Sequence, residues 1–422
     1  MAAERTILVT VQLDPRFSKG GARWSLEDEA GELKELTMSS GGRVVGEVTA
    51  QRHEPVAGTF LGTGKLEEIA QMVAQLQGQV VIFNQELSPA QQRNIEEIVR
   101  VKTIDRTQLI LDIFAQRAKS QEGKVQVELA QLRYLMPRLV GKGVMLSRLG
   151  GGIGTRGPGE QKLEVDRRRV RTRIARLDEE LDKLGRRREA TRSHRKETQV
   201  PVAALVGYTN AGKTTLLNRL TGASGTAQNQ LFTTLDPLAR RLRLPSGETI
   251  IVTDTVGFLH HLPHHLIEAF QATLEEARDA DLLLHVLDVS HPLAVEHARA
   301  VEEVLATLQL QEKPTMTILN KCDRLFDLQS VASLEHAYAP SAVISAKTGH
   351  GMEQLFAQLT RQLDLLLIEP VRLRLPSEHS ELLAAIYQSG QVMKRDDVEG
   401  MVELTVRIPA KLRAATLPYL HS

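Results

Sequence analysis

The sequence has very little cysteine and few aromatic residues. Cys322 is the single cysteine among 422 residues, so no disulfide can form within the chain, and a reducing cytosol is the expected compartment. Aromatic residues make up 4% of the chain, which argues against a protein that binds single strands by stacking bases on rings. The packed cores must therefore consist mainly of Leu, Val, Ile and Ala side chains.

Long apolar runs are also missing. No stretch of about 18 apolar residues occurs, so no membrane span is expected. The start, MAAERTILVT, lacks a cationic segment followed by an apolar one, as a secretion signal would have. We therefore expect a cytoplasmic monomer, and peripheral association with a membrane stays open.

Charge of one sign is not in excess overall, but it is unevenly distributed. The net charge is +1, whereas residues 162–197 contain 14 Lys and Arg against 8 Asp and Glu, a balance of +6. A neutral protein with one basic arm can present one surface to an anionic partner. Composition alone favours a solvated helix with internal i,i+4 ion pairs, because acidic residues are frequent in the same stretch.

The apolar pattern predicts an α/β fold in four parts. Residues 1–118 alternate strand and helix signals, which is typical of an α/β domain with a mostly parallel sheet. Residues 119–197 read as a two-helix arm joined by a loop, in which eight of the residues 141–160 are glycine. Residues 198–368 read as a second α/β domain, a mostly parallel sheet flanked by helices, and residues 369–422 as a small α+β domain.

The expected elements follow from periods of two and of three to four residues. Strands are expected at 7–13, 43–50, 80–83, 101–104, 202–206, 249–253, 315–319, 371–375, 391–394 and 402–408. Helices are expected at 66–76, 89–99, 107–115, 122–139, 161–195, 215–220 and 381–387. The apolar stripe of the long charged helix consists of Leu163, Val170, Ile174, Leu177, Leu181 and Leu184. Such a narrow stripe is typical of one arm of a helical hairpin.

A phosphate-binding motif, G-x-x-x-x-G-K-[ST], follows the strand expected at 202–206 and precedes a helix-compatible run. Its residues are Gly207, Tyr208, Thr209, Asn210, Ala211, Gly212, Lys213 and Thr214, with Thr215 next. The glycines let backbone N–H groups wrap phosphates, and the helix start adds its positive end. Lys213 is expected to reach the β- and γ-phosphates and Thr214 to coordinate Mg²⁺. A chance glycine turn is the alternative, and the strand–loop–helix context argues against it.

A second motif, D-x-x-G, follows the strand expected at 249–253. Its residues are Asp254, Thr255, Val256 and Gly257. An aspartate at this strand end is expected to hold Mg²⁺ through water, and the Gly257 N–H to face the γ-phosphate. Phe258 stands next, where many GTPases place a glutamine that orients the attacking water. We therefore expect slow intrinsic hydrolysis until a partner orders the loop or supplies a polar group.

Two further motifs are suited to reading a purine base. Asn320, Lys321, Cys322 and Asp323 follow the strand expected at 315–319, and Ser345, Ala346 and Lys347 end the next one. A carboxylate at Asp323 can accept hydrogen bonds from N1–H and the 2-amino group of guanine, whereas adenine would leave it unpaired. The four motifs in this order resemble the translation-factor-related class of P-loop GTPases. That resemblance implies that Asn320 supports the N7 edge and that the Ala346 N–H donates to O6.

A switch loop is expected between the first two motifs, at Phe232, Thr233, Thr234, Leu235 and Asp236, followed by Pro237. A threonine here should bind Mg²⁺ and sense the γ-phosphate. Thr233 and Thr234 are both candidates on the sequence. The family resemblance described below favours Thr234, which leaves Thr233 as a solvent-facing residue. With Lys213 and Gly257, Thr234 completes the expected catalytic set.

Two other patterns invite a functional reading that we consider weaker. Residues 62–65, Gly-Thr-Gly-Lys, resemble a second phosphate loop, but Thr59 stands in place of the first glycine and Leu66 in place of Ser/Thr. A turn that opens a helix is the preferred interpretation. The second pattern is the histidine set His260, His261, His264 and His265. Histidines four apart on a helix could bind a metal, but Pro263 interrupts them, so a polar loop is preferred.

A more specific resemblance comes from the glycine loop. The segment reads Gly150-Gly151-Gly152-Ile153-Gly154-Thr155-Arg156-Gly157-Pro158-Gly159-Glu160, followed by Lys162-Leu163-Glu164 and Asp166-Arg167-Arg168. Together with the phosphate loop, the 232–237 stretch and residues 254–258, it closely resembles the HflX family of GTPases over nearly the whole chain. Gln161 departs from the threonine of the family pattern, and Leu238 from its usual polar residue. Neither lies at an expected phosphate or metal contact.

The HflX resemblance implies a GTPase that binds the large ribosomal subunit and splits stalled or idle ribosomes, notably under heat stress. It implies that the N-terminal domain and the glycine loop enter the peptidyl-transferase region. Arg148 and Arg156 in that loop can approach RNA closely, and the basic helix can contact phosphates. Substrate and product are then GTP and GDP, with Mg²⁺ as cofactor. Whether ATP also binds stays open.

Two alternative functions stay open on the sequence. One is a GTPase that assists large-subunit assembly or remodels RNA, and the other is a GTP-switched regulator of a non-ribosomal protein. The basic arm discriminates between these classes, because association through RNA phosphates weakens sharply as salt rises. Charge reversal at Arg167, Arg168 and Arg169 tests whether the arm serves ribosome-stimulated hydrolysis.

Overall fold

The computed structural model describes residues 3–14, 16, 24–141, 158–198, 200–222, 232, 238–260, 271–325, 329–366, 370–398, 400–408 and 412–421. The chain divides into two compact units. The first comprises Met1–Leu184, Asn229–Asp236 and His261–Gln271, and the second Gly185–Gln228, Pro237–His260 and Ala272–Ser422. No helix within the described ranges is both long and apolar enough to cross a membrane.

The first unit begins with a parallel sheet of strand order β2-β1-β3-β4, as the alternation of strands and helices predicts. Its elements are β1 (Arg5–Leu13), α1 (Leu26–Ser39), β2 (Arg43–Arg52), α2 (Thr63–Leu76), β3 (Val80–Phe83), α3 (Pro89–Val99), β4 (Lys102–Asp105) and α4 (Arg106–Arg117). Helices α2 and α3 contact each other, as do α1 and α4. Ile69 of α2 and Ile95 of α3 lie in one apolar cluster with Val9 of β1 and Val81 of β3.

Helix α1 was not among the expected elements. It begins after Ser25, whose side chain accepts a hydrogen bond from the Asp28 N–H, and the Asp28 carboxylate accepts one from the Ser25 N–H. This capping box satisfies two backbone donors at the helix start. Only Leu33 and Leu36 among its large apolar side chains are buried, so the apolar period is short and easily missed. The S-x-x-D spacing was the signal that could have revealed it.

Residues 62–65, the Gly-Thr-Gly-Lys segment that resembles a second phosphate loop, lie at the start of α2. The helix begins at Thr63 with Gly62 as its N-cap. The Lys65 Nζ lies 2.9 Å from the Glu68 carboxylate one turn along the same helix. The lysine is therefore already engaged on the helix surface, which agrees with a turn that opens a helix.

A buried ion pair fixes the end of the first sheet to the chain that leads into the glycine loop. Asp105 ends β4, is 1% exposed and caps α4 by accepting from the Gln108 N–H. Arg138 lies in η1 (Met136–Gly141) and donates to the Asp105 carboxylate at 3.1 Å and to the Leu87 carbonyl at 2.7 Å. Burial raises the pKa of Asp105, and Arg138 counteracts this. Removing one partner of such a buried ion pair strongly destabilises the folded protein.

Glu29 on α1 gives the first unit a pH-dependent stability. Burial raises the pKa of Glu29 to about 7, although Arg106 and the Asn84 amide, 2.6 Å away, favour the charged form. The folded state then binds more protons than the unfolded state between pH 4.5 and 7, so stability falls as pH rises through that window. Glu29→Gln is expected to match the wild type near pH 4.5 and to be more stable by about 2 kcal/mol at pH 8.

Urea unfolding followed by the fluorescence of Trp24, the single tryptophan and a buried residue of this unit, measures that difference. Glu27→Gln is the matched control, because Glu27 is an exposed residue of the same first turn. A Glu29→Gln profile that keeps the wild-type slope between pH 4.5 and 7 would contradict the assignment.

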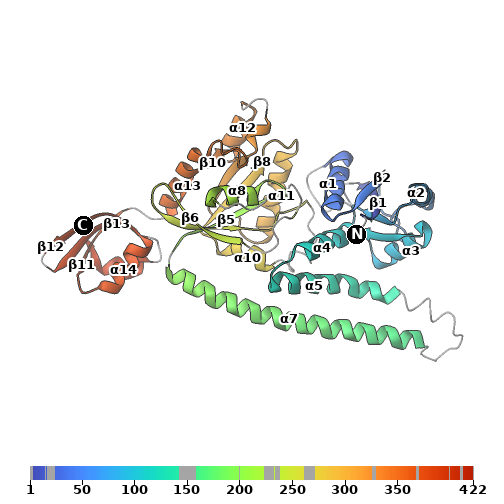
Figure 1. Ribbon diagram of the computed structural model, residues 1–422, viewed down its shortest axis with the longest axis horizontal. Helices are drawn as coiled ribbons and strands as arrows, with labels where there is room; N and C mark the ends of the chain where they lie inside the picture. Colours follow the sequence, from blue (N-terminus) through green and yellow to red (C-terminus); the bar gives the residue numbers. More distant parts are fainter. Residues whose placement is uncertain are drawn as a thin grey trace. The chain divides into compact units, whose positions relative to one another are not determined.

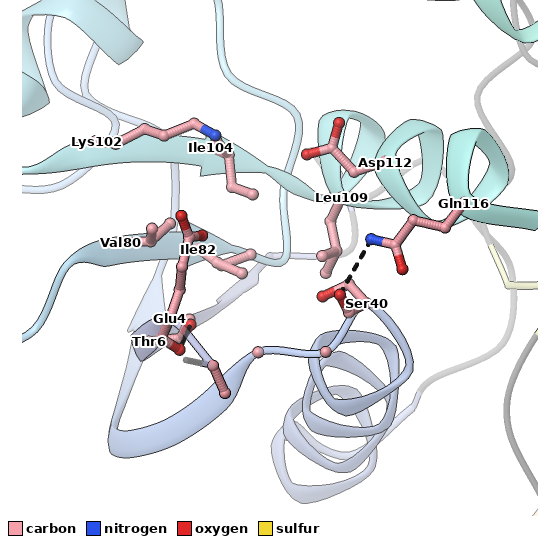
Figure 2. Close-up of a pocket in the computed structure, with 13 residues that line it drawn as sticks. Glu4, Thr6, Ser40, Val80, Ile82, Lys102, Ile104, Leu109, Asp112 and Gln116 are labelled. Carbon is pink, nitrogen blue, oxygen red and sulfur yellow. Dashed lines mark hydrogen bonds between the residues drawn. The ribbon is translucent and has the colours of Figure 1, made fainter. Parts of the chain in front are cut away.

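A cavity of about 510 Å³ lies in the first unit, between α4 and the first residues of β3 and β4 (Figure 2). Its apolar lining includes Val80 and Leu109, and its charged side chains are Glu4, Lys102 and Asp112. Burial raises the pKa of Asp112, and Lys102 opposes the shift. Two carboxylates against one lysine in the lining make the cavity poorly suited to phosphate groups.

Helices α5 (Gln121–Leu135) and α7 (Pro158–Thr198) run side by side, as expected for the arm (Figure 1). Leu177 of α7 is fully buried against Val125 and Leu129 of α5. At the edge of this contact the Arg173 guanidinium makes two hydrogen bonds to the Glu128 carboxylate, at 2.6 and 2.7 Å. The glycine loop from residue 142 to 157 lies outside the described residues.

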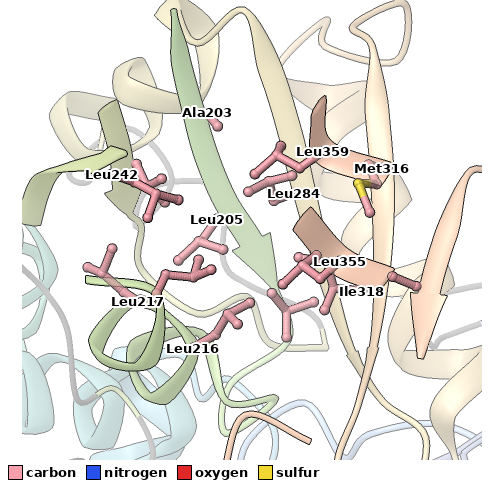
Figure 3. Close-up of a cluster of buried hydrophobic side chains, with 14 of the residues drawn as sticks. Ala203, Leu205, Leu216, Leu217, Leu242, Leu284, Met316, Ile318, Leu355 and Leu359 are labelled. Carbon is pink, nitrogen blue, oxygen red and sulfur yellow. The ribbon is translucent and has the colours of Figure 1, made fainter. Parts of the chain in front are cut away.

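The second unit contains a mostly parallel sheet of order β10-β9-β8-β5-β7-β6, in which β6 is antiparallel. Its elements are β5 (Val202–Gly207), α8 (Lys213–Thr221), β6 (Leu238–Arg243), β7 (Thr249–Asp254), α10 (Gln271–Asp279, whose first residue belongs to the first unit), β8 (Leu282–Asp288), α11 (Ala294–Thr307), β9 (Thr315–Asn320), η2 (Cys322–Arg324), α12 (Gln329–Ala337), β10 (Ser341–Val343) and α13 (Met352–Leu366). Leu216 and Leu217 of α8 pack with Leu355 of α13 on one face (Figure 3). Ala298 of α11 packs on the other face.

The end of the chain forms an antiparallel sheet of order β12-β13-β11-β14. Its elements are β11 (Val371–Pro376), α14 (Ser380–Ser389), β12 (Gln391–Val398), β13 (Met401–Arg407), α15 (Arg413–Thr416), η4 (Leu417–Tyr419) and β14 (Leu420–His421). Ile386 of α14 packs with Leu404 and Val406 on one face of the sheet. This arrangement agrees with the expected small α+β architecture.

Candidate nucleotide-binding site

The predicted motifs meet at one edge of the second sheet. β5 ends at Gly207, β7 at Asp254 and β9 at Asn320, and these strands are parallel to one another or to β8 between them. The carboxyl ends of parallel strands lie at the same edge, where open α/β sheets bind ligands. The sequence order of the motifs is thus converted into spatial proximity by the sheet topology.

Lys213, the first residue of α8, lies inside the loop that precedes it. Its side chain is 7% exposed, and Nζ donates to the carbonyls of Gly207 and Tyr208, each at 2.9 Å. Burial lowers the pKa of Lys213 to about 8, Asp254 opposes that shift and Lys321 adds to it. A phosphate beside this ammonium would relieve the cost of burying it.

The phosphate loop depends on Gly212 at its last turn. Gly212 has a φ of +102°, which L side chains rarely adopt. A Cβ at this position would also lie 2.3 Å from the Asn320 amide nitrogen. The loop can therefore close against the base-binding segment only because residue 212 has no side chain.

Thr214 and Asp254, two of the predicted magnesium residues, are brought together. The Thr214 hydroxyl donates to the Asp254 carboxylate at 2.7 Å, and Asp254 is fully buried. Hydroxyl and carboxylate oxygens are ligands that Mg²⁺ prefers. The oxygen donors of these two residues therefore fit a magnesium ion. Among the described residues no group of three His, Cys, Asp or Glu side chains could hold a metal by itself.

The D-x-x-G segment lies against the phosphate loop. The Phe258 N–H donates to the Gly207 carbonyl at 3.1 Å, and the Thr209 N–H donates to the Phe258 carbonyl at 2.8 Å. A Cβ on Gly257 would lie 2.9 Å from the Thr209 Cα and 3.1 Å from the Lys213 Nζ. Gly257 therefore allows the close approach of two backbones. The Thr209 hydroxyl is buried and makes no hydrogen bond to the described part of the chain, which suits a polar ligand.

Phe258 is a buried residue of this segment. The ring is 2% exposed and belongs to the largest fully buried side chains of the described chain. The sequence left open how water is positioned with a phenylalanine after Gly257. Phe258 thus lacks a polar group for orienting water, and its buried ring contributes to packing instead.

Tyr208 has a role that the motif did not reveal. Its hydroxyl accepts a hydrogen bond from the His260 N–H at 2.9 Å. Its ring stacks on the His297 ring of α11, with centroids 3.9 Å apart and planes 5° apart. The first variable position of the phosphate loop is thus tied to the segment after Phe258. No spacing rule links residue 208 with residue 297, so only the fold could reveal it.

Asn320 connects the predicted base-binding segments with the phosphate loop. The Asn320 amide donates to the Ala211 carbonyl at 2.8 Å, and its oxygen accepts from the Ala346 N–H at 2.9 Å. Asn320 thereby joins the phosphate loop to the 345–347 segment. The Lys321 Nζ pairs with Asp288 at 2.7 Å, a partner that the sequence did not indicate. Asp323 is exposed, so its carboxylate is accessible to a ligand, as the predicted role in binding a base requires.

The remaining predicted residues are placed as follows. Thr255 is fully buried and its hydroxyl donates to the Leu205 carbonyl at 2.6 Å, while Val256 is 5% exposed. The Ser345 hydroxyl is buried and accepts from the Thr348 N–H at 3.1 Å. Cys322 is a buried thiol whose pKa is raised by burial. Partly buried or exposed positions are Asn210 in the phosphate loop, Thr215 in α8 and Lys347 after β10.

The switch loop is described only at Phe232. Its ring is 2% exposed and lies edge-on against Phe114 of α4, with centroids 4.5 Å apart, within the first unit. Thr233, Thr234, Leu235 and Asp236 lie outside the described residues, as do His261, His264 and His265. Their expected roles stay predictions.

Comparisons with known proteins cover nearly the whole chain. Residues 27–115 match the GTP-binding GTPase N-terminal family, 117–195 the GTP-binding GTPase middle region, 202–321 the 50S ribosome-binding GTPase family and 332–417 the HflX C-terminal domain. The GTPase HflX of Caldanaerobacter subterraneus subsp. tengcongensis is 46% identical over 414 residues, 97% of this chain and 93% of the relative. The chain belongs to the HflX family of GTPases.

A second HflX relative has similar coverage. The GTPase HflX of Escherichia coli is 45% identical over 381 residues, which are 90% of this chain and 89% of the relative. Among solved structures, a GTP-binding protein from Sulfolobus solfataricus in complex with GDP is 24% identical, with a TM-score of 0.45. The match covers 86% of this chain and 99% of that one. HflX membership confirms the resemblance inferred from the glycine loop and the nucleotide motifs.

Proposed function

We propose that this HflX-family GTPase binds the large ribosomal subunit and dissociates stalled or idle ribosomes into subunits, with a role in rescue after heat stress. The observation that carries the proposal is family membership over nearly the full chain, including a match of residues 202–321 to ribosome-binding GTPases. The proposed organisation keeps four parts, 1–118, 119–197, 198–368 and 369–422.

The proposed nucleotide chemistry uses residues from every motif. Lys213 contacts the β- and γ-phosphates, and Asp323 selects guanine. Thr214 and Thr234 hold Mg²⁺, with Asp254 acting through water. When bound, the ion neutralises charge on the phosphates. Gly257 and Thr234 sense the γ-phosphate, so GTP and GDP favour different arrangements of the two switch loops.

Hydrolysis is proposed to depend on the ribosome. Phe258 supplies no polar group that could orient water, and its ring is buried. Its backbone forms hydrogen bonds with the backbones of Gly207 and Thr209, which hold this segment against the phosphate loop. A partner that orders the switch loops, or that supplies a polar group, would complete the site.

The proposed RNA-binding surface is the exposed face of α7. Arg168 and Arg176 are exposed, lie two turns apart on one face, and form no ion pair with a described residue. Arg173, by contrast, is held by Glu128 of α5. The arm therefore divides its basic residues between holding the hairpin together and facing outward, where RNA phosphates could be contacted.

The test of the proposed function is sucrose-gradient profiling of ribosomes incubated with the full-length protein and a non-hydrolysable GTP analogue. Conversion of monosomes into free subunits supports splitting. Binding to the large subunit without loss of monosomes favours assembly or remodelling instead. Failure to sediment with any ribosomal particle at low salt would contradict a ribosomal function.

Reversing the charges at Arg168 and Arg176 to Glu is expected to weaken ribosome binding by at least about tenfold at physiological salt, because two phosphate contacts become repulsive. The slope of log affinity against log salt should become shallower by about 1.5, since each lost contact accounts for roughly 0.7 to 0.9. Binding is measured by co-sedimentation over a salt series.

The matched control replaces both arginines by lysine, which keeps the point charge for phosphate contact. This variant should retain most of the affinity and the salt slope. Nucleotide affinity should be unchanged in all variants, because neither arginine is near the phosphate loop in sequence or in the described contacts. Equal ribosome binding by the wild type and the glutamate variant would remove the arm from the interface.

A further inference from the structure

Arg219 stands outside every nucleotide motif, yet it contacts one of them. It is an exposed residue of the last turn of α8, the helix whose first residues are Lys213 and Thr214. Its Nε donates to the Ala346 carbonyl at 3.1 Å, and Nη2 donates to the Lys347 carbonyl. A planar guanidinium offers two donors on one edge, so it suits two neighbouring carbonyls.

The segment that Arg219 contacts is a tight loop after β10. The Ser345 N–H donates to the His350 carbonyl at 3.0 Å, and the Gly349 N–H donates to the Ser345 carbonyl at 2.8 Å. These bonds close the base of the loop. They use neither the Ala346 nor the Lys347 carbonyl, and both of these accept from Arg219. Arg219 thus fixes the two peptide planes that follow the Ala346 N–H.

Two side chains therefore hold the two peptide groups that flank the Ala346 Cα. Asn320 accepts from the Ala346 N–H at 2.9 Å, and Arg219 donates to the Ala346 carbonyl. Because α8 is a single short helix, its first turn sits in the phosphate loop while its last turn holds the loop that faces the base. The phosphate and base parts of the site are joined through one rigid element.

We propose that Arg219 is a positioning residue for guanine selection, which fixes the 345–347 loop so that the Ala346 N–H, accepted by Asn320 in this structure, can share its hydrogen bond with guanine O6. The inference rests on the proposed guanine-binding role of Asp323 and Ala346. Without the guanidinium the loop can rotate about the Ala346 and Lys347 peptides, and the hydrogen bond to O6 is weakened. Contacts of Asp323 with N1–H and the 2-amino group are made by a different loop and stay intact.

The experiment compares three nucleotides on the full-length protein by titration calorimetry. GDP offers all base contacts, 6-thio-GDP has a poor acceptor in place of O6, and IDP lacks the 2-amino group. Arg219→Ala is expected to bind GDP about tenfold more weakly than the wild type, the order of one lost hydrogen bond. The affinity of Arg219→Ala for 6-thio-GDP should fall about twofold or less. The variant should therefore prefer GDP over 6-thio-GDP less strongly than the wild type does.

Arg240→Ala is the matched control. The Arg240 Nη1 donates to the Asn218 side chain and the Thr221 hydroxyl, each at 3.0 Å, in the same turn of α8, and does not contact the 345–349 loop. It should leave the GDP to 6-thio-GDP ratio unchanged. Arg219→Lys, which can reach one carbonyl, should restore part of the ratio.

The outcomes separate this inference from the assignment on which it depends. A ratio that is unchanged in Arg219→Ala, or that shrinks equally in Arg240→Ala, overturns the positioning role. A wild-type protein that binds IDP as tightly as GDP overturns the role of Asp323 itself, whatever the Arg219 variants do. General damage to the fold would lower affinity for all three nucleotides alike.

Discussion

Replacing Lys213 with alanine is expected to weaken GDP and GTP binding by about 10²- to 10³-fold. The ammonium lies inside the phosphate loop and is held by the Gly207 and Tyr208 carbonyls. Removing one member of a buried, hydrogen-bonded charge pair costs roughly 3 to 4 kcal/mol, which corresponds to that loss. Competition against a fluorescent GDP analogue measures the effect, and the affinity for inorganic pyrophosphate should fall in parallel.

Lys213→Met separates loss of binding from loss of folding. Burial lowers the pKa of Lys213 to about 8, despite the nearby Asp254 carboxylate. A charged lysine there opposes folding at neutral pH by an amount on the order of 3 kcal/mol. A methionine of similar length removes that charge, so its free energy of unfolding should equal or exceed that of the wild type. Near-wild-type GDP affinity in a stable Lys213→Met protein would refute the phosphate role.

Asp323→Asn is expected to lower GDP affinity by about 10²- to 10⁴-fold. The carboxylate can accept from both N1–H and the 2-amino group of guanine, whereas an amide offers one acceptor and turns a donor toward the amino group. Asp323 is an exposed residue of η2, after β9, so its replacement should not disturb the core. Titration calorimetry with GDP measures the loss.

Xanthosine diphosphate provides the positive control for the Asp323 variant. Xanthine has a carbonyl where guanine has the 2-amino group, so the asparagine amide can donate to it while its oxygen accepts from N1–H. The variant should therefore bind xanthosine diphosphate more tightly than the wild type does. Pyrophosphate affinity should be unchanged, because the phosphate loop is intact. Unaltered GDP affinity, with no gain for xanthosine diphosphate, would refute the base assignment.

Some elements with a strong apolar period could be predicted from the sequence almost to the residue, whereas the equally buried strand β8 was not among the expected strands. The strand at 80–83 and the helix at 89–99 have the predicted bounds, because four consecutive buried residues and a capping box mark them clearly. Helix α1 was missed because its buried apolar residues are few, and its capping box lies where no strong period draws attention. Local signals suffice only where burial is dense.

The nucleotide site was predictable for a different reason. Phosphate loops, D-x-x-G and the asparagine–aspartate motif are short segments whose geometry is set by neighbouring residues in the chain. The contacts of Tyr208 with His260 and His297, and of Arg219 with the 345–347 loop, link residues 52 to 128 positions apart. Contacts between residues so far apart in the sequence follow no fixed spacing, so no sequence motif predicts them.

The sequence by itself determined the α/β fold class, the nucleotide motifs and the HflX family, because each is encoded in local order and residue type. The tertiary structure decided which residues support those motifs. Parallel strands placed Thr214 beside Asp254 and Asn320 beside Ala211 and Ala346. Helix α8 then brought Arg219 to the base loop. Glu128 of α5 came to hold Arg173 of α7, whereas Arg168 and Arg176 form no ion pair with a described residue. These contacts depend on how segments far apart in the sequence pack, because only packing brings their side chains within hydrogen-bonding distance.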